Sequence, residues 1–145
     1  MTTAHAHARS HAHAHRPQLA RMRDVMTATP HTIGSEQKLS LAHRKMNEHH
    51  LRHLPVLRAG KLVGILTQRD LYFLQSMAGV DVHLDLIADA MTPDVYTTTP
   101  DATVRDVARE MADHKFGCAV IVDKDEVIGI FTITDALRYL ADVLA

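Results

Sequence analysis

A constant offset of 65 positions relates the two halves of this 145-residue chain. Residues 64–70 and residues 129–135 both read Gly-apolar-apolar-Thr-x-x-Asp, and the alignment extends toward the N-terminus without a gap. The offset pairs further identical residues: Asp24 with Asp89, Met26 with Met91, Thr27 with Thr92, Thr32 with Thr97, Met46 with Met111 and His49 with His114. Repetition at one fixed distance indicates a duplicated structural unit. Because each copy is too short to bury a good core alone, we expect the two copies to pack against each other.

Length, charge and cysteine content exclude several classes of protein. The length suits one compact unit or two closely joined half-domains. A net charge of −1 and the lack of a basic stripe with interleaved aromatic residues argue against nucleic-acid binding. Cys118 is the single cysteine and cannot form an intramolecular disulfide bond, and apolar runs of about six residues are too short to span a membrane. The N-terminus also lacks the apolar core of a signal peptide, so we predict a soluble, cytoplasmic protein without a nucleic-acid or membrane partner.

The spacing of apolar residues predicts the same order of elements in both copies. Apolar residues at i, i+3 and i+7 predict one helix in each copy: Leu39, Ala42 and Met46 in the first, Val104, Val107 and Met111 in the second. A hairpin of two apolar strands follows, and the next helix begins at the Thr of the shared motif. The predicted strands cover residues 54–57, 61–66, 119–122 and 127–131. With a short strand near Thr32 and near Thr97, each copy reads β-α-β-β-α, which predicts an α/β fold of two repeats packed as a pseudo-two-fold pair.

These elements divide the chain into four segments. Residues 1–17 are rich in alanine and histidine, show no helical or strand periodicity, and are predicted to form a disordered tail. Residues 18–78 are assigned to the first repeat with an N-terminal helix, residues 79–88 to a linker, and residues 89–145 to the second repeat.

The repeated motifs resemble those of a known family. Each copy opens with an apolar-Met-Thr signature, at 25–27 and 90–92, and closes with the Gly-to-Asp motif, while the first copy also carries His-Leu-Pro-Val at 53–56. Present twice and in register, these motifs resemble the cystathionine-β-synthase-type (CBS) domain pair, or Bateman module, from about residue 23 to residue 144. The resemblance is to stand-alone CBS domain-containing proteins, because no catalytic domain or transporter span accompanies the two repeats.

The resemblance implies regulatory binding of an adenosine-containing ligand such as AMP, ADP, ATP, S-adenosylmethionine or NAD. The carboxylate of Asp70 or Asp135 can accept two hydrogen bonds from the vicinal hydroxyls of a ribose. Thr67 and Thr132 stand at a strand-to-helix junction, where the N–H groups of a helix start attract a phosphate. Arg69 is a candidate phosphate contact.

Two further features complete the implied site. By resemblance, the stretches near Thr32 and Thr97 would frame the adenine through backbone groups. Gly64 and Gly129 are expected to leave room for a nucleotide close to the backbone.

Thr-x-x-Asp also has a purely structural interpretation. At a helix start it is related to the capping box, in which the Thr caps the helix and the acid bonds back to the Thr N–H. A structural cap would be duplicated together with its repeat, so the duplication leaves both interpretations open. The family resemblance favours ligand contact in at least one copy, and the two roles are compatible.

The copies differ at positions that bear on phosphate binding. Arg52 and Arg69 of the first copy become Gly117 and Thr134 in the second. We therefore expect the two clefts to differ in phosphate preference, and we favour the cleft with Asp70 for a charged nucleotide. His53, directly before Leu-Pro-Val, is expected to contact phosphate or solvent rather than a metal.

Histidines near the N-terminus form a second chemical feature. Neutral imidazoles are good ligands for zinc, nickel or copper, but a flexible segment imposes no geometry on a metal. We interpret this stretch as a tag or a plain tail, with metal binding as the weaker alternative. The candidate ligands are His5, His7, His11, His13 and His15.

No catalytic constellation emerges, so we predict no enzyme and no required cofactor. Cys118 begins a predicted buried strand, where a lone thiol is usually a core residue.

Exposed apolar faces on the helices at 71–77 and 136–144 suggest a homodimer. The predicted function is a sensor, for example of energy state, in which a nucleotide in the inter-repeat cleft changes the packing and an unidentified partner protein detects the change. The alternative is an interaction or dimerisation module with vestigial clefts.

Overall fold

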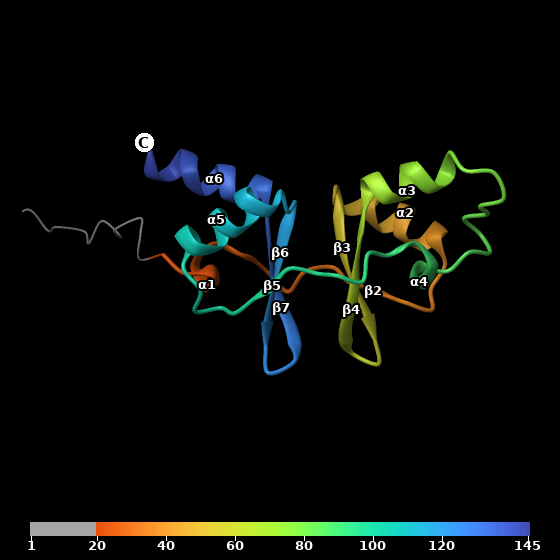
Figure 1. The fold of residues 1–145 in the computed structure, drawn as a ribbon, viewed down its shortest axis with the longest axis horizontal. Helices are drawn as coiled ribbons and strands as arrows, with labels where there is room; N and C mark the ends of the chain where they lie inside the picture. Colours follow the sequence, from red (N-terminus) through yellow and green to blue (C-terminus); the bar gives the residue numbers. More distant parts are fainter. Residues whose placement is uncertain (1–19) are drawn as a thin grey trace, which may run out of the picture.

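The computed structural model describes residues 20–145, which form two α/β halves (Figure 1). The first copy comprises β2 (Ile33–Gly34), α2 (Leu39–His49), β3 (His53–Arg58), β4 (Lys61–Thr67) and α3 (Gln68–Gln75). The second comprises β5 (Thr97–Thr98), α5 (Val104–His114), β6 (Cys118–Asp123), β7 (Glu126–Thr132) and α6 (Ile133–Val143). The predicted order β-α-β-β-α is confirmed in both copies. The segment predicted to be a tail, residues 1–17, lies outside the described residues.

Short elements precede each copy, two before the first and one before the second. They are α1 (Met22–Val25), β1 (Thr27–Ala28) and α4 (Ile87–Ala90).

Each half has its own sheet, and the two sheets share one register. β3 and β4 form an antiparallel hairpin, and β2 joins β3 in parallel with Ile33 opposite Val56. In the second half β6 and β7 form the hairpin, and β5 joins β6 in parallel with Thr98 opposite Ile121. These pairs are related by the offset of the sequence repeat, so the duplication extends to the hydrogen-bonding pattern of the strands.

The two sheets meet in the middle of the molecule, and the helices cover their outer sides (Figure 1). Ile65 of β4 packs with Val120 and Ile130 of the second half in an apolar cluster. Each half also has a core beneath its helices, with Leu66 fully buried in the first and its counterpart Phe131 fully buried in the second. Within residues 20–145, no helix has the length and apolar character needed to cross a membrane.

The short segments before the two copies are exchanged between the halves. Met22 of α1 is buried in the core of the second half, whereas Ile87 of α4 is buried in the core of the first. β1 pairs with β7 through Thr27 opposite Ile130, and the counterpart residue Thr92 forms a bridge with Ile65 of β4. Each half is therefore completed by the segment that precedes the other copy.

This exchange explains the glycine that opens the shared motif. A Cβ on Gly64 would lie 2.6 Å from the Met91 sulfur and 2.9 Å from the Thr92 carbonyl oxygen, and a Cβ on Gly129 would likewise collide with Met26. The methionine of each Met-Thr signature thus packs directly on the glycine of the opposite half. The expectation that these glycines leave room for a nucleotide is wrong, because a methionine side chain occupies that space.

Candidate functional site

The first Thr-x-x-Asp motif forms a complete capping box at the start of α3. The backbone N–H of Thr67 donates to Asp70 Oδ2 at 3.1 Å, and the N–H of Asp70 donates to Thr67 Oγ1 at 3.1 Å. This reciprocal pair satisfies two N–H groups that a helix start would otherwise leave unpaired. The structural interpretation of the motif is therefore confirmed in the first copy.

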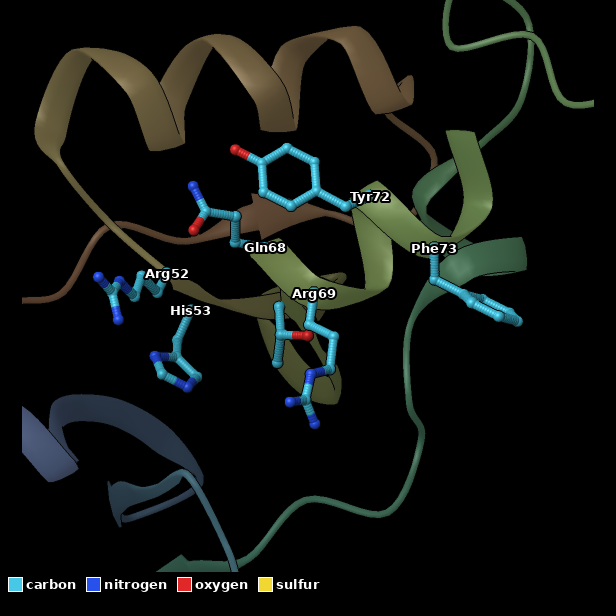
Figure 2. A pocket seen from close by; sticks show the side chains of 7 residues that line it. Arg52, His53, Gln68, Arg69, Tyr72 and Phe73 are labelled. Carbon is cyan, nitrogen blue, oxygen red and sulfur yellow. The ribbon is translucent and has the colours of Figure 1, made fainter. Parts of the chain in front are cut away.

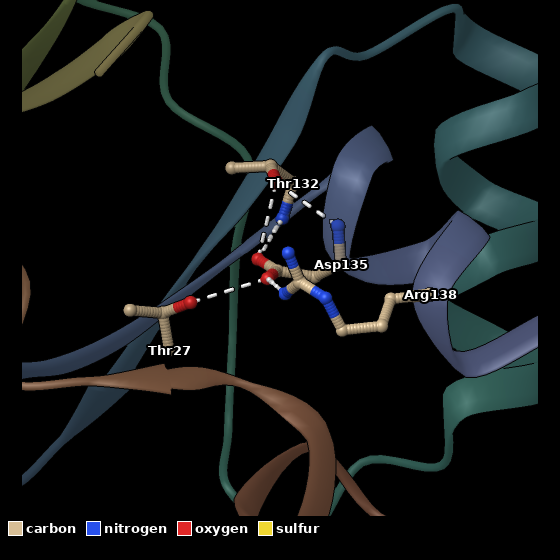
Figure 3. Close-up of polar contacts among 4 residues, drawn as sticks. All are labelled: Thr27, Thr132, Asp135 and Arg138. Carbon is tan, nitrogen blue, oxygen red and sulfur yellow. Dashed lines mark hydrogen bonds and ion pairs between the residues drawn. The ribbon is translucent and has the colours of Figure 1, made fainter. Parts of the chain in front are cut away.

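The second motif forms the same box but engages its carboxylate further (Figure 3). Asp135 Oδ2 accepts from the N–H of Thr132 at 2.9 Å and from its Oγ1 at 3.1 Å. Asp135 Oδ1 accepts from Thr27 Oγ1 at 3.1 Å and from Arg138 Nη1 at 3.4 Å. Only 8% of the Asp135 surface is exposed, so protein groups occupy both oxygens of this carboxylate.

Asp70 differs because its second oxygen is not engaged. Among the described residues, no donor reaches Asp70 Oδ1. The position equivalent to Arg138 is Phe73, which has no donor, and Thr92, the counterpart of Thr27, makes no side-chain hydrogen bond to Asp70 within the described residues. Asp70 therefore retains the hydrogen-bonding capacity that a ribose would need.

A cavity of about 550 Å³ lies at the start of α3, beside this cap. Figure 2 shows its side chains, which come from the start of β3 and the residue before it, from the end of β4, and from α3. The lining residues are Arg52, His53, Thr67, Gln68, Arg69, Tyr72 and Phe73. Two guanidinium groups, an imidazole and a helix start give the pocket the character of an anion site.

The second half has no equivalent set of basic side chains. The counterparts of Arg52, His53 and Arg69 are Gly117, Cys118 and Thr134. Burial raises the pKa of the Cys118 thiol to about 12, so this sulfur stays protonated and is a core residue rather than a nucleophile.

His53 stands where the pocket meets the second half. Its Nε2 lies 3.1 Å from the position that a Cβ on Gly117 would take, and Figure 2 shows its ring directed toward the ribbon of the second half. The pKa of His53 is lowered, first by burial and then by the charge of Arg52, while the charge of Asp70 opposes the shift. These effects together favour the neutral form of the imidazole at neutral pH.

The structure gathers some of the predicted site residues and separates others. His53, Thr67 and Arg69 line one pocket. Asp70 does not line it but shares two hydrogen bonds with Thr67, which does. Thr32 and Thr97 do not line this pocket. The Thr32 carbonyl accepts a hydrogen bond of 2.7 Å from Lys45 Nζ, and Thr97 pairs with Val120 of β6.

The prediction omits residues that the fold brings to the pocket. Arg52 is not among the predicted ligand-binding residues, although its difference from Gly117 marks the position as one that bears on phosphate binding. Gln68, Tyr72 and Phe73 gave no signal, because their place on the pocket side of α3 depends on how the helix packs.

An apolar groove of about 420 Å³ forms a second surface feature, between α5 and α6. Its lining residues are Val104, Arg105, Ala108, Ile133, Ala136, Leu137, Tyr139 and Leu140. In the first half, Val80 and Val82 of the connecting segment pack on the core beside α2, and the N–H of Ser40 donates to the Val82 carbonyl at 2.8 Å. In the second half Leu137 is 59% exposed.

The histidine candidates for a metal site, His5 to His15, lie outside the described residues. In the part of the chain that the structure describes, no group of three or more His, Cys, Asp or Glu side chains could hold a metal ion. His31 and His49 stack with their ring centroids 3.9 Å apart, an arrangement that does not direct both rings at one ion.

Comparison with known proteins identifies the family. The CBS domain profile matches residues 22–75 and 87–142, one match for each sequence copy. The chain belongs to the CBS domain family. The CBS domain pair of protein MJ0100, solved with 5′-methylthioadenosine and S-adenosyl-L-methionine, is similar with a TM-score of 0.79 at 28% identity. The similarity covers 86% of this chain and 98% of that one.

Two relatives place the CBS pair in different contexts. Inosine-5′-monophosphate dehydrogenase of Korarchaeum cryptofilum is 36% identical over 115 residues, which make up 79% of this chain but 22% of that enzyme. The CBS domain-containing protein YhcV of Bacillus subtilis is 26% identical over 117 residues, 81% of this chain and 83% of that protein. The match with the dehydrogenase therefore covers a minor part of the enzyme.

Proposed function

We propose that this CBS pair binds an adenosine-containing nucleotide at the first half and acts as a regulatory module without a reaction of its own. The proposal is carried by the difference between two equivalent carboxylates. Asp70 keeps a free oxygen beside a pocket with three basic side chains, while protein donors occupy both oxygens of Asp135. The adenosine ligands of the MJ0100 CBS pair support the ligand class.

Each part of such a ligand has a chemical partner in the first half. The free oxygen of Asp70 would accept hydrogen bonds from the ribose hydroxyls. The guanidinium groups of Arg52 and Arg69 would bind the phosphate with charge-assisted hydrogen bonds, and the start of α3 adds a favourable dipole. The backbone near Thr32 is the proposed contact for adenine.

A ligand in this pocket would act on the packing between the halves. His53 lines the pocket and also contacts Gly117 of the second half, next to the apolar cluster that joins the sheets. A ligand that moves His53 would shift the balance between arrangements of the two halves by its differential affinity for them. A partner protein that binds one arrangement better would then respond to the nucleotide.

We also propose that two copies of the chain associate through the apolar groove between α5 and α6. Leu137 and Leu140 expose two aliphatic side chains there, whereas the equivalent positions of the first half hold Tyr72 and the polar Gln75. Leu137→Glu should convert a dimer into a monomer in light scattering, and Tyr72→Glu at the equivalent position should not. A monomeric wild-type chain would contradict this assembly.

Titration calorimetry with AMP, ATP and S-adenosylmethionine tests the site. Asp70→Asn should weaken nucleotide binding by about 10- to 150-fold, because one charge-assisted hydrogen bond contributes about 1.5–3 kcal/mol. Asp135→Asn is the matched control and should leave the affinity close to wild type. Unchanged binding by Asp70→Asn would refute the site, and no binding by the wild-type chain would favour the alternative of an interaction module with vestigial clefts.

A further inference from the structure

The phosphate side of the pocket holds one group that can change its charge near neutral pH. Of the basic side chains that line it, His53 carries the imidazole, a group whose ordinary pKa of about 6.5 is close to neutrality. His53 is half-buried, at the start of β3, so water only partly shields it from a charge in the pocket.

The groups around His53 leave it uncharged when the pocket is empty. On its own half it faces Arg52 beside it, Arg69 and Asp70 from α3, and the uncharged Thr67 opposite it on β4. From the second half Gly117, which has no side chain, lies beside the ring, and the nearest charged residue along the chain is Lys115, which is exposed.

A phosphate dianion would reverse this balance. It would add negative charge within the same cavity, and a nearby negative charge favours the protonated form of an imidazole. The His53 ring lies against Gly117, so the rest of the chain limits how far it can turn away from an incoming anion.

We propose that His53 takes up a proton when a phosphorylated ligand occupies this pocket, so that the site selects phosphate-bearing adenosine compounds more strongly as the pH falls toward 6.5. This inference rests on the proposed function and adds to it a residue that determines specificity and a linkage to protons. The second half cannot do the same, because Cys118 and Thr134 replace the histidine and one of the arginines.

Proton uptake on binding measures this linkage directly. Calorimetry of the full chain with AMP at pH 7.0, in two buffers of different ionisation enthalpy, gives the number of protons bound per ligand. The wild-type chain should take up a fraction of a proton with AMP and none with adenosine. The AMP phosphate, with a second pKa of about 6, releases protons when it binds as a dianion, so its contribution has the opposite sign.

Two histidine variants make the measurement specific. His53→Gln should abolish the uptake and flatten the pH dependence of AMP affinity, which in the wild type should weaken about three- to tenfold between pH 6.5 and 8.0. His43→Gln is the matched control, because burial also lowers the pKa of His43 although it does not line the pocket. It should behave like the wild type.

The outcomes separate the inference from the function on which it rests. AMP binding with equal proton uptake in the wild type and His53→Gln would overturn the inference and leave the nucleotide site standing. If His53→Gln fails to fold, equal uptake of protons with AMP and adenosine in the wild type would overturn it. No AMP binding at all would refute the proposed function, and the inference with it.

Discussion

The two halves of this CBS pair share their packing and differ in their pocket. Gly64 and Gly129 both receive a methionine from the opposite half, and Thr67 and Thr132 both cap a helix. The positions around the start of α3 and α6 have diverged, with Arg52 in one half and glycine in the other. Residues that are identical in both copies, such as the glycine and the threonine of the shared motif, serve the fold. Residues that differ between the copies give each half its own pocket.

The largest expected effect tests whether the two cores are equally important. Phe131→Ala should lower the free energy of unfolding by about 3–5 kcal/mol, and Leu66→Ala at the equivalent position by about 2–5 kcal/mol, because both side chains are fully buried. Urea unfolding followed by circular dichroism measures both. A single transition for each variant is expected, and two separate transitions would show that the halves unfold independently.

Exchanging the pocket residues between the halves sharpens the comparison of ligand affinity. The double variant Arg52→Gly, Arg69→Thr gives the first half the residues of the second, and AMP should bind about 10- to 100-fold more weakly because two phosphate contacts are lost. Adenosine, which lacks the phosphate, should be affected far less. Equal losses for AMP and adenosine would place the arginines away from the phosphate.

The two capping aspartates should differ in their effect on stability. Asp135→Asn should lower the free energy of unfolding by about 1–3 kcal/mol, because Thr27 and Arg138 lose a charged partner that is almost fully buried. Asp70→Asn should cost about 0.5–1 kcal/mol, because only the cap is weakened. Thermal unfolding without ligand compares the two, and a larger loss for Asp70→Asn would contradict the assignment of roles.

The smallest expected effect is a pH dependence from the first half. Burial lowers the pKa of His53 and of His43 below the ordinary value of 6.5, so the unfolded chain binds more protons than the folded chain at slightly acidic pH. The free energy of unfolding should therefore fall as the pH drops below about 6.5. Removing His53 by the His53→Gln substitution should reduce this slope, and an unchanged slope would show that other groups are responsible.

The sequence predicted the repeated fold because the relevant signals are local. Leu39, Ala42 and Met46 mark the buried face of α2, and Thr67 with Asp70 marks the start of α3, since each pattern lies within one element. The Thr-x-x-Asp pattern could not show whether Asp70 also binds a ligand. The capping box engages one carboxylate oxygen, and the sequence does not reveal what surrounds the other.

The relation between the halves could not be derived from local patterns. α1 and α4 are four residues long, too short for a periodicity that would reveal which core buries Met22 and Ile87. The contact of Met26 with Gly129 joins residues far apart in the sequence, so both glycines looked like room for a ligand. Phe73 and Thr92 stand where Arg138 and Thr27 engage Asp135, and the Thr27 contact with Asp135 also joins residues far apart in the sequence.

The exchanged helices also set the order in which the chain can fold during synthesis. The first repeat is made first, but its core stays open until Ile87 has left the ribosome. Met22 is synthesised before either repeat, yet its site includes Phe131, so it must remain without its native neighbours while about a hundred further residues are added. A nascent chain therefore carries an apolar segment that only its own completion can cover, and a chain cut between the two repeats would yield two fragments that each lack a piece of core.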